Sequence, residues 1–139
     1  MNPKELLVGE VSAKRGEKKT GKLTTFYMRD GSQVDIPVLL INGLKEGPIV
    51  SSVSGRHSNE LPGTLSTIEI FKMLDPMDMS GAFIGIPMAT PTALHHGWRV
   101  NILDLREMIW PGHPGGTITQ RISHTVFKHV YEQSDLFIS

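Results

Sequence analysis

The feature that most constrains the fold of this chain is the change of pattern that begins at Gly47. The short apolar run Ile49–Val53 is typical of a strand. A helix is predicted from about Gly63 to Leu74, and another short apolar strand at Phe83–Pro87. The apolar residues of the predicted helix recur at helical spacing, namely Leu65, Ile68, Phe71 and Leu74. A strand–helix–strand order of this kind indicates an α/β protein.

The last third of the chain continues the same alternation. After a long loop rich in proline and glycine, Thr117–Tyr131 is the clearest helix of the sequence, and Thr117 or Thr119 supplies a hydroxyl for its N-cap. Its apolar stripe consists of Ile118, Ile122, Val126 and Val130. A final strand is expected at Asp135–Ile138.

The first third of the chain is predicted to be rich in β-hairpins. Glu5–Ser12 and Lys22–Met28 have strand-like composition, and Asp30–Gly31 is a tight-turn signal. Gln33–Ile41 follows as a strand, in which Pro37 removes one ladder donor and so favours an edge strand or a bulge. Together these patterns predict the α/β class, with a mixed β-sheet flanked by helices.

Composition excludes several functional classes. The 139 residues carry 14 basic and 14 acidic side chains, which argues against a nucleic-acid partner, and there is no cysteine for thiolate or disulfide chemistry. No apolar run approaches the roughly 20 residues of a membrane helix, and no secretory signal opens the chain, so we expect a cytoplasmic protein without a membrane partner. The basic stretch Lys14–Lys22 is interpreted as a solvated loop, with a phosphate-binding patch as the alternative.

The most informative residues for function are His57 and Glu60. They follow the end of a predicted strand, near Gly55, where the chain turns toward a helix. Ligand crevices form at the carboxyl ends of strands in α/β sheets, and imidazole nitrogen and carboxylate oxygen are good Zn²⁺ ligands. The spacing alone is weak evidence, because such a pair is also common as a simple surface contact.

The surroundings of this pair resemble the succinylglutamate desuccinylase/aspartoacylase family, a group of zinc-carboxypeptidase-like amidohydrolases. The family's Gly-Pro, apolar strand and Gly-x-His-Gly-[Asp/Asn]-Glu-x-x-Gly pattern matches Gly47, Pro48, Gly55, His57, Asn59, Glu60 and Gly63. Further similar segments follow in the family's order, at Phe83–Pro91, Trp110–Gly112 and Thr117–Ile122. The resemblance spans roughly Arg29 to Ser139.

The resemblance implies a zinc-carboxypeptidase-like fold and hydrolysis of the amide bond of a small N-acyl amino acid. His57 and Glu60 would be two of the Zn²⁺ ligands, and Asn59 would lie beside them as a contact to ligand or substrate. Arg106 is the candidate for binding the substrate carboxylate. Its alternative interpretation is an exposed arginine paired with Asp104 or Glu107.

The sequence also departs from the family. Ser58 replaces a glycine, and the family's Asp-Leu-Asn-Arg is not intact at Asp104–Ile109. The family's third ligand, a histidine, and its catalytic glutamate would fall after Ser139. No catalytic residue is therefore predicted within the chain, and whether it is an enzyme stays open. Residues 1–139 are interpreted as one partial deacylase domain that binds Zn²⁺ weakly.

Several alternatives follow from these departures. Another histidine could complete the metal site; the loop histidines His95, His96 and His113 are the candidates, whereas His124 and His129 are expected on the surface. The chain could instead be a non-catalytic binding or assembly module. Its last strand would then favour a homo-oligomer, unless a C-terminal segment completes the sheet.

Overall fold

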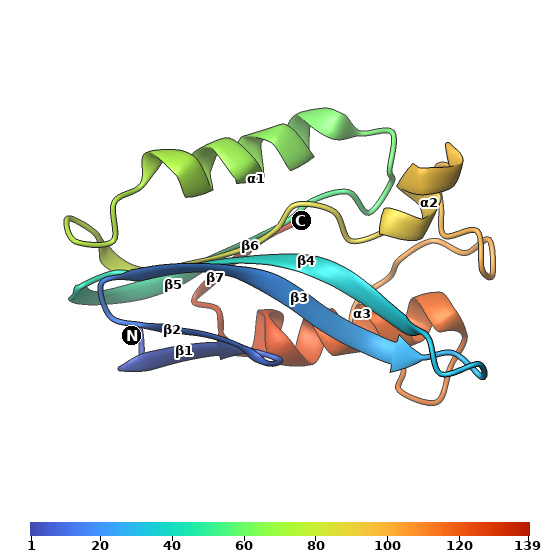
Figure 1. The fold of residues 1–139 in the computed structure, drawn as a ribbon, viewed down its shortest axis with the longest axis horizontal. Coiled ribbons are helices and arrows are strands. Elements are labelled where there is room, and N and C mark those ends of the chain that lie inside the picture. Colours follow the sequence, from blue (N-terminus) through green and yellow to red (C-terminus); the bar gives the residue numbers. More distant parts are fainter.

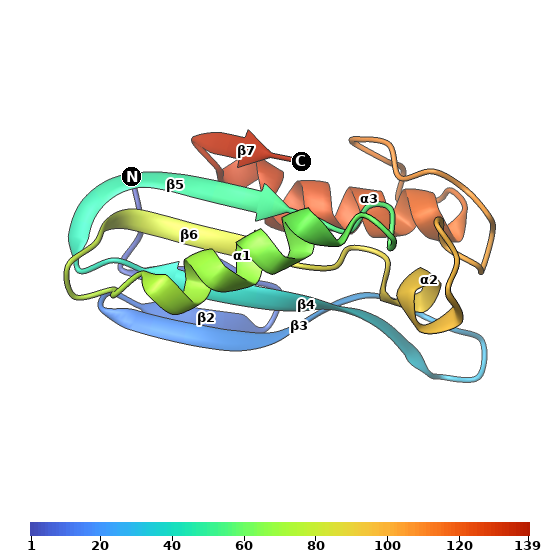
Figure 2. The same ribbon diagram turned by 90° about the horizontal axis from the view of Figure 1, so that it is seen from above.

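The computed structural model describes all 139 residues as a five-stranded mixed sheet with helices on both faces (Figures 1 and 2). The strand order is β3–β4–β6–β5–β7, and a separate hairpin pairs β1 with β2. Helix α1 covers one face of the sheet, while α3 and the small hairpin cover the other (Figure 1). The strands are β1 (Glu5–Val8), β2 (Val11–Lys14), β3 (Glu17–Tyr27), β4 (Gln33–Asn42), β5 (Lys45–Val53), β6 (Ser80–Ile86) and β7 (Leu136–Ile138). The helices are α1 (Leu61–Met73), α2 (Pro91–His96) and α3 (Ile118–His129), followed by the 3₁₀ turn η1 (Tyr131–Gln133). The predicted mixed sheet with flanking helices is confirmed.

The antiparallel hairpin of β3 and β4 follows the predicted turn. Gly31 has φ +83°, a conformation that the Asp-Gly signal supplies, and alternate residues of β4 are buried on one face. Strand β4 is internal rather than an edge strand, contrary to one interpretation of Pro37. Only β3 pairs with Pro37, because the ladder between β4 and β6 begins at Leu39, and β3 carries a bulge between Thr24 and Phe26. A proline therefore fits this part of an internal strand.

The basic stretch Lys14–Lys22 is not a loop, and this prediction was wrong. Lys14 ends β2, and Glu17 begins the long strand β3 after a turn in which Gly16 has φ +81°. Strand β3 lies at the edge of the sheet, where exposed lysines are favourable because they discourage pairing with another chain. The charge density that suggested a loop is instead typical of an edge strand.

Strand β5 pairs in parallel with β6, so their carboxyl ends lie at the same edge of the sheet. Helix α1 connects the two strands and lies where the sequence predicted a helix. The predicted buried stripe is wrong, however: Leu65 is 60% exposed, and Thr67 is the only buried residue of α1. The Thr67 hydroxyl points toward β5, and its methyl group lies over Gly85 of β6. Because Gly85 has no side chain, Thr67 can approach the sheet closely, and this contact determines which face of α1 is buried.

Helix α3 confirms its prediction. The side chain of Thr117 accepts a hydrogen bond from the Gln120 backbone, and the Gln120 side chain accepts one from the Thr117 backbone, which forms a capping box. Ile122, Val126 and Val130 are buried against the sheet. Helix α2, by contrast, lies inside the predicted long loop. None of the helices has the length and apolarity that crossing a membrane requires.

Candidate functional site

The His57 turn, residues 54–60, joins the carboxyl end of β5 to α1. Its backbone is held against the segment after β6, because Ala89 donates to the carbonyl of Ser54 and Thr90 donates to that of Gly55. Gly55 has φ +67°, and an added Cβ would lie 2.6 Å from the sulfur of Met88. Only glycine fits this position, which explains the glycine two residues before His57.

The imidazole of His57 lies at the centre of a charged cluster. Its Nδ1 is 2.9 Å from Glu60 Oε1 and 3.2 Å from Arg99 Nη2, while its Nε2 contacts Glu107 Oε2. Arg99 Nη1 also donates to Glu107 Oε1 at 2.8 Å. The His57 side chain is 17% exposed, whereas those of its charged neighbours are about half exposed. We call Glu60, Arg99 and Glu107, together with His57, the His57 cluster.

The electrostatics of the cluster favour an ionised Glu107. The hydrogen bond with His57 and the positive charge of Arg99 hold the pKa of the Glu107 carboxyl below its usual value. The carboxylate bridges an imidazole and a guanidinium, which is a strong arrangement because charge-assisted hydrogen bonds are shorter and stronger than neutral ones.

The His57 turn also holds the two loop segments that bring Arg99 and Glu107. The buried Ser58 donates its backbone N–H to the Arg99 carbonyl at 3.0 Å and its hydroxyl to the Trp98 carbonyl. Arg56 donates from Nη2 to the Met108 carbonyl at 2.7 Å, next to Glu107. Its guanidinium carbon lies 5.8 Å from the centre of a Trp110 ring, within cation–π range.

The sequence-predicted residues are placed as follows. His57, Glu60 and the exposed Asn59 line one hollow of about 620 Å³. Arg106 is exposed and lines a different hollow with Trp110, and its side chain pairs with neither Asp104 nor Glu107. The arginines near His57 are Arg99 and Arg56, which were not predicted from the sequence. For Arg56 the available signal was its position next to His57; for Arg99 no local pattern pointed to the site.

The structure contains no group of three or more histidine, aspartate or glutamate side chains that could hold a metal ion. Glu107 does not complete a three-ligand metal site with His57 and Glu60. Glu60 contacts Nδ1 of the His57 ring and Glu107 contacts Nε2, so the two carboxylates cannot bind one ion together with the same ring nitrogen. The three candidate histidines do not contribute either, and two of them, His95 and His96, lie in α2 rather than in a loop. His96 contacts the Thr92 carbonyl, and His113 accepts from the Gly115 backbone.

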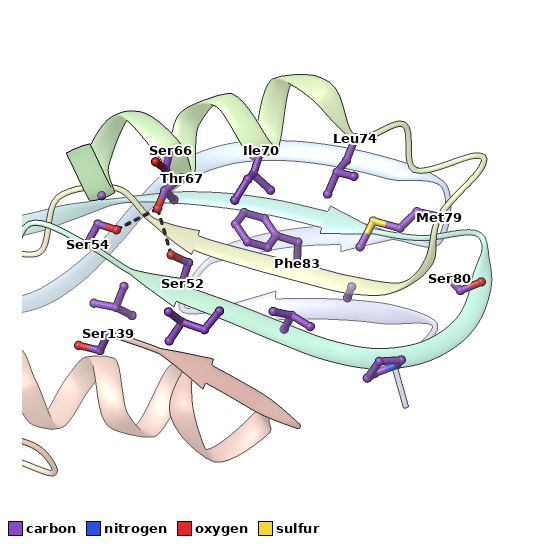
Figure 3. A pocket seen from close by; sticks show the side chains of 16 residues that line it. Ser52, Ser54, Ser66, Thr67, Ile70, Leu74, Met79, Ser80, Phe83 and Ser139 are labelled. Atoms are coloured by element: carbon purple, nitrogen blue, oxygen red, sulfur yellow. Dashed lines mark hydrogen bonds between the residues drawn. The ribbon is translucent and has the colours of Figure 1, made fainter. Parts of the chain in front are cut away.

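An apolar groove adjoins this hollow, between α1 and strands β5 and β6 (Figure 3). It has a volume of about 580 Å³, and Ile70, Leu74 and Phe83 lie along it. At the end nearer the His57 turn, the Thr67 hydroxyl is 3.0 Å from that of Ser52 and 2.9 Å from that of Ser54. The groove and the hollow share four lining residues, namely Val53, Ser54, Gly63 and Ser139.

No protein-family model matches the sequence, and no curated protein matches it. Solved structures do match. An aspartoacylase family protein from Mesorhizobium loti is similar with a TM-score of 0.77 and 25% identity, over 86% of this chain and 38% of that one. A succinylglutamate desuccinylase/aspartoacylase from Rhodobacter sphaeroides gives a TM-score of 0.78 at 23% identity, with the same coverage of 86% and 38%.

A third similar structure is the product-bound ectoine utilization protein from Ruegeria pomeroyi, with a TM-score of 0.75 and 24% identity. It too is matched over 86% of this chain and 38% of its own length. The chain therefore spans well under half the length of the structures that it resembles. The resemblance expected from the sequence is confirmed in three dimensions: this chain has the fold of part of a succinylglutamate desuccinylase/aspartoacylase family protein.

Proposed function

We propose that this chain carries part of the site of a zinc-dependent hydrolase of the succinylglutamate desuccinylase/aspartoacylase type, with a zinc-carboxypeptidase-like fold. The reaction would be hydrolysis of the amide bond of an N-acyl amino acid. The observation that supports the proposal is the pair of His57 Nδ1 and Glu60 Oε1, 2.9 Å apart at the carboxyl end of β5. A nitrogen and an oxygen at this separation can both reach one ion.

The donor types fit Zn²⁺, and the number of donors determines how tightly it is held. In catalytic zinc sites three protein ligands leave a position for water, so His57 and Glu60 alone should bind weakly. When bound, Zn²⁺ acidifies water and polarises an amide carbonyl. Glu60 is 64% exposed in its side chain and is free to turn toward an ion.

The arginines beside His57 suit an anionic substrate. The guanidinium of Arg99 lies in the cluster, and Arg56 lines the hollow with its Nε buried and without a hydrogen-bond partner. A planar guanidinium can hold a carboxylate with two parallel hydrogen bonds. We propose that Arg99 and Arg56 orient the substrate carboxylate, with Asn59 as a polar contact, and that Arg106 is less well placed for this role than the sequence suggested.

The test is a calorimetric titration of the protein with Zn²⁺. We expect one weak site in the wild type and at least a tenfold loss of affinity in His57→Ala, because the only nitrogen ligand is removed. The matched control is His129→Ala, which removes an exposed histidine of α3 that has no contact with the cluster. A wild type that binds no Zn²⁺, or a His57→Ala variant that binds as tightly as the control, would contradict the proposal.

A second candidate function is a non-catalytic module that acts through assembly. The observation that favours it is β7, an edge strand in which Leu136 is 55% and Ile138 is 54% exposed. Exposed apolar edge strands tend to pair with another chain. Sedimentation of the protein at several concentrations tests this function: a concentration-dependent dimer supports it, and a monomer throughout the range contradicts it.

A further inference from the structure

The three polar contacts of the His57 ring make conflicting demands on its protons. At Nδ1, Glu60 Oε1 can only accept a hydrogen bond, whereas Arg99 Nη2 can only donate one. At Nε2 there is a single partner, the Glu107 carboxylate, which accepts. A neutral imidazole carries one proton, so it cannot satisfy all three partners.

Counting the satisfied contacts identifies the preferred form of the neutral ring. With the proton on Nε2, His57 donates to Glu107 and its Nδ1 lone pair accepts from Arg99, while Glu60 receives no hydrogen bond from the ring. With the proton on Nδ1, His57 donates to Glu60 alone. The acceptor Glu107 then faces the Nε2 lone pair, and the donor Arg99 N–H faces the Nδ1 proton. The first form makes two hydrogen bonds and the second makes one, so the contacts favour the proton on Nε2.

We propose that Glu107 is a positioning residue, which accepts a hydrogen bond from the Nε2 proton of His57 and so leaves Nδ1 unprotonated, on the side of the ring where Arg99 and Glu60 lie. The expected effect of Glu107 on metal binding rests on the proposed function, whereas its effect on the His57 ring does not. Histidines that bind metals almost always donate their other ring N–H to a carboxylate, carbonyl or water, which fixes the ring and its basicity. Glu107 supplies that carboxylate to His57.

The anchoring of Glu107 agrees with this role. Arg99 holds one carboxylate oxygen at 2.8 Å, and the bond from Arg56 to the Met108 carbonyl fixes the backbone of the next residue. Met108 itself is 1% exposed and belongs to the core. The carboxylate is therefore placed by a buried neighbour and two arginines, although its own side chain is 46% exposed.

The experiment compares the wild type with Glu107→Ala and Glu107→Gln, and uses Glu132→Ala, an exposed glutamate paired with Lys128, as the matched control. The first readout is the nitrogen NMR spectrum of the His57 ring in the metal-free protein, at a pH where the ring is neutral. We expect the proton on Nε2 in the wild type and in the control, and a mixture of both forms in Glu107→Ala. Glu107→Gln should keep the wild-type form, because its amide oxygen still accepts.

The second readout is the Zn²⁺ affinity, which should fall by about 10–100-fold in Glu107→Ala and recover most of that loss in Glu107→Gln. A wild-type ring protonated on Nδ1, or a Glu107→Ala ring with the wild-type spectrum, would overturn the proposal. If the wild type binds no Zn²⁺, the proposed function fails, and the NMR spectra of the metal-free protein still decide the role of Glu107.

Discussion

The contact between Thr67 of α1 and Gly85 of β6 gives a quantitative test of how the helix is seated beside the site. A Cβ added at Gly85 would lie 2.9 Å from Thr67 Cγ2 and 3.0 Å from Phe83 Cε1. Overpacking of this kind costs about 1–3 kcal/mol. Alanine also reduces the conformational entropy of the unfolded chain, which stabilises the folded state by about 0.4–1 kcal/mol. We therefore expect Gly85→Ala to lower the free energy of unfolding by about 1–2 kcal/mol.

A second substitution separates this contact from other effects of alanine. Thr67→Ser removes the methyl group that meets the new Cβ and keeps the hydroxyl that bonds Ser52 and Ser54. Alone it should cost about 1 kcal/mol, the value of one buried methyl group. In the double variant the methyl group introduced by Gly85→Ala fills the space that the Thr67 methyl has left. The double variant should therefore lie within about 1 kcal/mol of the wild type, a smaller loss than the sum of the two single losses.

Urea unfolding followed by tryptophan fluorescence measures all four proteins, since the chain has only Trp98 and Trp110 as fluorophores of this kind. Independent substitutions add to within about 0.3–0.5 kcal/mol. If Gly85→Ala and Thr67→Ser add within that limit, the two groups do not meet and the seating of α1 inferred from Thr67 is wrong. Unchanged m-values are required for the comparison, because they show that the unfolded states are alike.

Three further outcomes are expected. The hydrogen bond from Lys22 holds the pKa of Asp35 below its unfolded value of about 3.9. The ionised carboxylate therefore stabilises the fold above the unfolded pKa, and this stabilisation is lost as pH falls through the folded pKa. The urea midpoint of Asp35→Asn should therefore fall less steeply in acid than that of the wild type. Gly112→Ala should cost about 3 kcal/mol in urea unfolding, because Gly112 has φ +73° and an added Cβ would lie 2.3 Å from the Gln120 carbonyl oxygen. Thr117→Ala removes the N-cap of α3 and should cost about 1 kcal/mol, seen as a decrease of about 3 °C in Tm by circular dichroism.

Local patterns predicted the fold where one face of an element is buried. In β4 the alternation of Val34, Ile36 and Val38 identified the buried face, and in α3 the stripe through Ile122 and Val126 did the same. Such periodicity follows directly from burial on one side. The same reasoning failed for α1, because the apolar residue Leu65 is exposed there and the polar Thr67 is buried.

The physical reason for that failure lies outside the helix. Thr67 finds hydroxyl partners on β5 and space over Gly85 on β6, and neither is visible in the sequence of α1. A buried polar group is tolerated only where partners exist, so burial here was determined by the strands. The length of the helix was predictable from its own residues, and its orientation was not.

The candidate site likewise contains residues that the sequence could place together and residues that it could not. His57 and Glu60 are three residues apart, so sequence spacing alone placed them together. Arg99 and Glu107 are separated from His57 by 42 and 50 residues and come from segments without regular structure. No periodicity connects such positions. Their convergence depends on bonds from the His57 turn, which only a three-dimensional structure shows.

Those bonds connect the two stretches of sequence that depart from the expected family pattern. Ser58 stands where the resemblance led us to expect glycine, and its hydroxyl donates to the Trp98 carbonyl, which a glycine could not do. That bond fixes the loop from which Arg99 reaches Glu107, a residue of the other departing stretch. The two differences therefore meet in one set of contacts around His57.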